Sequence, residues 1–142
     1  MATVIEELER IRNANDGLLR PADVVEAARP RASPLHEKFT WDDSAAAHAY
    51  RLWQARELIQ VTVRVLPGST ESVRAYVSLS DDRSEEGGGY RCIVSVLSNK
   101  ATREQMLAEA LAELERIERT YKNLSELAAV FAAARKARAK AA

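Results

Sequence analysis

Residues 59–69 read IQVTVRVLPGS, and the spacing of apolar residues changes there from helical to alternating. Apolar and polar side chains alternate as far as Val65, and Pro67-Gly68-Ser69 is a turn signal. Alternation resumes over 73–79, so the two runs predict a hairpin. Residues 90–97 are rich in β-branched side chains and predict a third strand. We therefore expect residues 59–97 to form a three-stranded antiparallel sheet with one solvated face.

Three helices are expected ahead of this sheet, within residues 1–58. The first covers about residues 4–14 and begins at a capping box of Thr3 and Glu6. The second is about two turns long, because Pro21 suits a first helical position and Pro30 must stop the helix. After it we expect an ordered loop that its aromatic side chains pin to the core.

The third helix runs to about Leu58. Its cap is expected at Asp42 or Asp43, or at Thr40 paired with Asp43. From Ala45 onward it is apolar around most of its circumference, which predicts a buried central helix.

A long helix is expected over residues 100–139, beginning near Thr102, with an interruption near Asn123-Leu124-Ser125. Apolar residues at steps of three and four form a line that runs from Leu107 through Ala110 to Ala128 and Phe131. We call its large side chains before residue 125 the seam: Leu107, Leu114, Ile117, Tyr121 and Leu124. Such a line is typical of a coiled coil and needs an opposing apolar surface. That surface is either the chain's own sheet and third helix or a second copy, so this segment is a candidate dimerisation arm. The last eight residues are expected to form a frayed basic tail.

The fold class predicted from these elements is α+β, in a single domain 1–142. The chain has 142 residues with 21 basic and 21 acidic side chains, so its formal net charge is zero. This balance excludes a polyelectrolyte binder but leaves room for a local cationic face. Cys92 is the only cysteine, which excludes an intramolecular disulfide and a cysteine-based zinc site. No apolar run approaches the ~20 residues of a membrane span, so we expect a soluble cytoplasmic protein without membrane contact.

Signatures of enzymes are missing. The Gly87-Gly88-Gly89 run follows two glutamates and precedes a strand, which is typical of a loop tip and not of a phosphate-binding loop. No serine lies in a Gly-x-Ser-x-Gly motif, and Cys92 is interpreted as buried filler. A metal site would need His36, His48, Asp42 and Asp43 to converge. We expect no enzymatic activity, no cofactor and no metal.

Two features favour binding to a macromolecule. The first is the element order, three helices followed by a hairpin, which is similar to that of a winged helix. Against a DNA-reading role, the third helix would present Asp42 and Asp43 to phosphates, and its Arg51 and Arg56 are balanced by Glu57. The second feature is a group of cations around an aromatic on the polar face of the sheet, with a basic tail: Arg64, Arg74, Tyr76 and Arg91, then Arg135, Lys136 and Arg138. Such a surface could hold a nucleic-acid backbone with a stacked base, or an acidic partner.

A family resemblance covers about a third of the chain, from Gly17 to Ile59. It is carried by these stretches: Leu19-Arg20-Pro21, residues 23–28, Ser33-Pro34-Leu35-His36, Phe39, Trp41-Asp42-Asp43 and residues 50–56. These resemble a group of small proteins encoded by tailed bacteriophages and prophages. The resemblance implies a phage or prophage origin and a cytoplasmic accessory role in the host cell.

The leading hypothesis is a non-enzymatic, homodimeric accessory module that binds a macromolecule in a DNA-related process, namely replication, recombination or regulation, with the sheet face and the basic tail making the contact. The alternative is a protein-interaction or structural component, such as a host-factor inhibitor or a virion assembly part, that makes no nucleic-acid contact.

Overall fold

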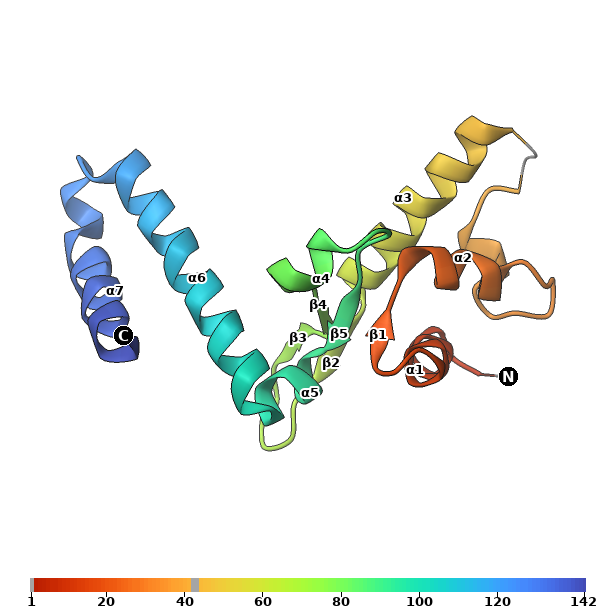
Figure 1. Cartoon of the computed structure of the whole chain (residues 1–142), viewed down its shortest axis with the longest axis horizontal. Coiled ribbons are helices and arrows are strands. Elements are labelled where there is room, and N and C mark those ends of the chain that lie inside the picture. Colours follow the sequence, from red (N-terminus) through yellow and green to blue (C-terminus); the bar gives the residue numbers. More distant parts are fainter. Residues whose placement is uncertain (1, 42–43) are drawn as a thin grey trace. The chain divides into compact units, whose positions relative to one another are not determined.

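The computed structural model describes residues 2–41 and 44–142 (Figure 1). The chain divides into two compact units, Met1–Ser95 and Val96–Ala142, which are described separately. Helices and small antiparallel sheets are both present, so the predicted α+β class is confirmed. The organisation as one domain stays a prediction.

The first two helices lie where the sequence predicts them. Helix α1, Val4–Ala14, begins with the expected capping box, in which Thr3 Oγ1 accepts from the Glu6 amide and Glu6 Oε2 accepts from the Thr3 amide. It ends before Asp16 and Gly17, which both have positive φ. Helix α2, Pro21–Ala28, has its proline in the first turn as predicted.

The loop after α2 is ordered around its aromatic side chains, as expected. Leu35 and Phe39 are buried on either side of a 3-10 turn, η1, at His36–Lys38. Trp41 Nε1 donates to the His36 carbonyl oxygen at 2.9 Å, and the two rings stack 5.0 Å apart. The Phe39 ring lies 5.9 Å from the Trp41 ring.

Helix α3 differs from the prediction at both ends. It spans Ala45–Val61, and its N-cap is Ser44, whose Oγ accepts from the Ala47 amide at 3.1 Å. The predicted caps Asp42 and Asp43 lie outside the described residues, and the prediction of either as the cap is wrong. The strand predicted from Ile59 begins only at Val63, because Ile59 follows the buried Ala55 at helical spacing and is itself fully buried on α3.

The predicted hairpin is confirmed, but it is a sheet of its own. Strand β2, Val63–Val65, pairs antiparallel with β3, Ser72–Arg74. A second sheet has the order β1-β5-β4, from Leu18–Leu19, Tyr90–Cys92 and Tyr76–Val77. The single sheet predicted over residues 59–97 is therefore wrong.

At Ala75 the backbone hydrogen bonds pass from one sheet to the other, which explains why the sequence predicts a single sheet. Its amide donates to the Thr62 carbonyl oxygen at 2.9 Å, beside the hairpin, while its carbonyl oxygen accepts from the Ile93 amide at 2.8 Å, beside the other sheet. The alternating run over 73–79 thus serves two sheets in turn. A short helix, α4, Ser80–Ser84, lies in the following segment.

The third predicted strand ends early. After Cys92 the chain becomes helix α5, Ile93–Ser98. Ile93 and Val96 are buried and lie three residues apart, a spacing that fits one face of a helix.

The C-terminal unit is a helical hairpin (Figure 1). Helix α6, Lys100–Tyr121, is capped by Asn99, and α7 spans Ala128–Ala141 after a 3-10 turn, η2, at Ser125–Leu127. The predicted interruption near Asn123–Ser125 is confirmed. The predicted frayed tail is wrong, since alanine favours helix and α7 runs to Ala141.

Candidate interaction surfaces

The predicted cationic face does not form, because Arg64 and Arg74 lie on opposite faces of the hairpin. Arg64 pairs across the strands with Val73, and Arg74 pairs with Val63. Directly opposed residues share a face, and neighbours along a strand alternate. Arg74 is exposed, whereas Arg64 is partly buried with its Nη1 3.3 Å from the Sγ of buried Cys92.

Tyr76 is part of the core and not a surface aromatic. It is fully buried, and its phenol donates to Glu9 Oε1 at 2.8 Å. Burial, together with the Glu9 carboxylate, raises the pKa of Tyr76 far above its ordinary value. The prediction that Tyr76 lies on a solvated face is wrong, and this ring is closed to a stacked base.

Arg91 lies in β5 and is held by a buried carboxylate. Its Nε and Nη2 donate to the two oxygens of Asp82, at 2.8 and 2.7 Å. Asp82 is buried, and its hydrogen bond to the guanidinium raises the pKa of Arg91. Arg91 and Tyr76 also fall on opposite faces of their sheet, because Tyr76 pairs with Cys92 and Val77 with Arg91.

Two of the three predicted tail cations face α6. Arg135 forms an ion pair with Glu118, and Arg138 Nε lies 3.9 Å from Glu115 Oε2. Lys136 is exposed on α7. The tail is therefore the second helix of the hairpin, with its arginines turned to the acidic side chains of α6.

The seam, which follows α6 and ends at Leu124 in the turn after it, remains largely exposed within this unit. Four of its five side chains are 40–48% exposed: Leu107, Ile117, Tyr121 and Leu124. Leu114 is half-buried, and the one fully buried residue of α6 is Leu111, which lies toward α7. The hairpin thus leaves an apolar line without cover from its own second helix.

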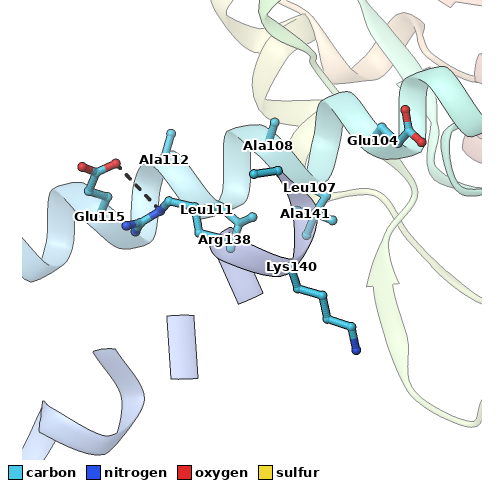
Figure 2. A pocket seen from close by; sticks show the side chains of 10 residues that line it. Glu104, Leu107, Ala108, Leu111, Ala112, Glu115, Arg138, Lys140 and Ala141 are labelled. Carbon is cyan, nitrogen blue, oxygen red and sulfur yellow. Dashed lines mark ion pairs between the residues drawn. The ribbon is translucent and has the colours of Figure 1, made fainter. Parts of the chain in front are cut away.

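A groove of about 760 Å³ opens between α6 and the last turn of α7 (Figure 2). Its lining includes an apolar side formed by α6, comprising Leu107, Ala108, Leu111 and Ala112. Glu115 and Arg138 face each other at one end (Figure 2). Their charged atoms lie 3.9 Å apart, which is an ion pair but exceeds the length of a hydrogen bond.

A surface missed by the sequence analysis lies on the outer side of α3. Tyr50 and Trp53 are 48% and 50% exposed, and their rings stack 5.5 Å apart. Exposed small residues, Ala46 and Ala49, lie beside them at helical spacing. We call these four residues the α3 face.

The opposite side of α3 carries a buried arginine. Arg51 is 5% exposed, lies over the Trp41 ring at 5.3 Å and donates to the Thr40 carbonyl oxygen at 3.2 Å. The helix therefore buries a guanidinium and exposes two aromatic rings. The sequence does indicate that some apolar side chains of this helix are exposed, because the apolar residues of 45–58 surround the whole helix and cannot all face one core.

The predicted candidate metal ligands do not converge in the part of the chain that the structure describes. No group of three His, Cys, Asp or Glu side chains there could hold a metal ion. His36 lies with its Nδ1 2.9 Å from the Ala28 carbonyl oxygen, while His48 is exposed on α3. No helix among residues 2–41 and 44–142 is long and apolar enough to cross a membrane.

The winged-helix comparison holds for element order alone. Residues 29–44 separate α2 from α3, where a helix-turn-helix has a turn of about 3–4 residues. Comparison with protein-family models, curated proteins and solved structures finds no match for this chain.

Proposed function

We propose that the chain is a non-enzymatic, homodimeric protein-interaction module whose N-terminal unit binds another protein through the α3 face. The resemblance over residues 17–59 supports a phage or prophage accessory protein that acts inside the host cell. The partner is then a phage or host protein.

The exposure of Tyr50 and Trp53 carries this proposal. Large exposed aromatic side chains that touch each other are costly in water, and contiguous apolar surface of this kind marks interaction sites. Tyrosine and tryptophan are also the side chains that contribute most to binding energy at protein interfaces. Ala46 and Ala49 leave room beside the two rings for an aliphatic side chain of the partner.

The charge of the α3 face favours a protein over a nucleic acid. Its four residues are uncharged, and the exposed charged side chains of α3 are one cation and one anion, Arg56 and Glu57. Nucleic-acid binding depends on cations that neutralise phosphates. The nucleic-acid hypothesis has less support, since the arginines it relied on are divided between faces or paired with carboxylates.

The test is site-specific photo-crosslinking in bacterial cells that produce the full chain. A crosslinking amino acid at position 53 should join the protein to one second polypeptide, and the same group at exposed Asn13 on α1 should not. The crosslinked partner, once purified, should bind the wild type and lose at least tenfold in affinity for Tyr50→Ala/Trp53→Ala. Equal binding of wild type and double variant would refute the role of the α3 face.

A further inference from the structure

We propose that a second copy of the chain docks on one face of the α6–α7 hairpin, so that two hairpins form an antiparallel four-helix bundle. The inference rests on the proposed function only for the dimeric state. It does not involve the α3 face, which belongs to the other unit.

The hairpin is short of buried apolar surface on its own. The buried residues of its two helices are Leu111, Phe131 and Ala134. Helices in water depend on the packing of an apolar face, and two helices alone cannot enclose a core. The groove between α6 and the end of α7 also leaves apolar side chains of α6 without a packing partner in the hairpin.

The exposed and half-buried apolar residues of both helices lie on the same side of the hairpin. On α6, Leu114, Ile117 and Tyr121 lie about a quarter turn from Leu111, which faces α7. On α7, Val130 and Ala137 lie about a quarter turn from Phe131, which faces α6. Because the helices run antiparallel, these two quarter turns lead to the same side. The result is one continuous apolar face.

The size of this face suits a dimer. Helix α6 has 22 residues and α7 has 14, which correspond to lengths of about 33 and 21 Å. With helices about 10 Å wide, the hairpin presents roughly 500 Å² in projection, of the same order as the ~800 Å² of accessible surface that each partner buries in an ordinary interface.

Charges identify a second copy as the occupant. Helix α7 has four basic residues, Arg135, Lys136, Arg138 and Lys140, and no acidic one. Helix α6 has acidic residues on both sides: Glu115 and Glu118 face α7 of the same chain, and exposed Glu113 lies on the far side of the seam. If α6 of each copy lies beside α7 of the other, Glu113 lies near the exposed basic side of that helix, which includes Lys136. The face is thus complementary to itself under a two-fold axis, as a closed homodimer requires.

Light scattering of the full chain tests the proposal. The wild type at about 50 μM should have twice the monomer mass of 15.8 kDa. Ile117→Lys places a charge in the middle of the face and should give a monomer, whereas Ile117→Ala should raise the dimer Kd at least tenfold. Arg116→Glu changes the charge of an exposed neighbour outside the face and should leave the dimer intact.

Circular dichroism accompanies these measurements, because an unpartnered hairpin loses helix. A wild-type monomer would overturn the proposal, and so would an Ile117→Lys variant that stays dimeric. A dimeric wild type that gives no crosslink at position 53 would refute the α3 face alone, and a monomeric wild type that still gives this crosslink would refute the hairpin interface alone.

Discussion

The phenol of Tyr76 on β4 donates a hydrogen bond to Glu9 on α1, and the second oxygen of the same carboxylate accepts from Arg12. The Oη–Oε1 distance is 2.8 Å, and the Nη2–Oε2 distance is 2.7 Å. Glu9 therefore has a donor on each oxygen, and the pair ties the first helix to a strand far away in sequence. A ring expected to bind a partner instead holds the N-terminal unit together.

Tyr76→Phe removes one of these two donors and should lower the free energy of unfolding by about 1.5–3 kcal/mol, the usual range for a hydrogen bond to a charged group. Urea unfolding followed by circular dichroism measures the change. Tyr50→Phe is the matched control, since Tyr50 is half exposed, and it should be neutral. Equal stability of Tyr76→Phe and the wild type would mean that the bond contributes nothing net.

Stability should fall at both acid and alkaline pH. Burial opposes ionisation of Glu9, but hydrogen bonds from Arg12 and Tyr76 outweigh it and lower the pKa of Glu9. Its contribution is therefore present above the unfolded pKa of about 4.3 and lost as the pH falls through the folded pKa. For Tyr76 the pKa is raised, so its contribution is present below about pH 10 and lost as the pH rises.

The midpoint of urea unfolding, measured from acid to alkaline pH, gives the fall in stability on each side, which we call the acid limb and the alkaline limb. Glu9→Gln should flatten the acid limb only in part, because Arg10 also lowers the pKa of Glu7. An acid limb identical in Glu9→Gln and the wild type would contradict the role of Glu9.

The helical parts could be predicted from the sequence, because their ends carry local chemistry. The capping box of Thr3 and Glu6 marks the start of α1, and Pro21 marks the start of α2. Both signals depend on neighbouring residues alone. The hairpin of β2 and β3 could also be predicted, from its alternation and its turn, but the strand bounds could not, since Ile59 and Val96 fit both a strand and a helix when judged by apolar spacing. Whether such a segment forms a helix or a strand depends on which distant residues bury its apolar side chains. Ala75 also shows that one extended run can form hydrogen bonds with two sheets.

The candidate surfaces were harder to predict than the fold. The apolar circumference of the third helix predicts a buried central helix, and that prediction includes Tyr50 and Trp53, whereas a buried arginine is rare and nothing in the helix pattern singles out Arg51. Arg51 can be buried because its guanidinium contacts the Trp41 ring and donates to the Thr40 carbonyl oxygen inside the unit. Such compensation comes from the preceding loop, so the pattern of the helix alone does not reveal it.

Gly89→Ala should destabilise the sheet that contains β1 and β5. A Cβ atom at this position would lie 2.6 Å from Leu18 Cδ1 and 2.7 Å from its Cγ. Leu18 is buried, so its side chain cannot easily move aside, and overpacking of this kind costs about 1–3 kcal/mol. Thermal unfolding measures the change, and an unaltered Tm would show that Leu18 has another position open to it.

Arg91→Met should lower stability by leaving the buried Asp82 carboxylate without its two donors. Because the arginine side chain is itself more than a third exposed, we expect a loss of about 1–3 kcal/mol, below the range for a fully buried pair. Arg91→Met/Asp82→Asn should recover part of the loss in urea unfolding. A double variant less stable than the single one would show that the carboxylate has other partners.

Binding to DNA should be undetectable even at low salt, where contacts between cations and phosphates are strongest. The net charge is zero, Arg64 and Arg74 lie on opposite faces, and Arg91 is paired with a carboxylate. We expect a Kd weaker than about 10⁻⁴ M, the weak end of non-specific binding, for labelled duplex and single-stranded DNA in fluorescence anisotropy. Arg74 and Lys136 are both exposed. Tighter binding to DNA that weakens in Arg74→Ala or Lys136→Ala would restore the nucleic-acid hypothesis, because these cations would then contact phosphates. Neither residue belongs to the α3 face on which the protein-interaction proposal rests.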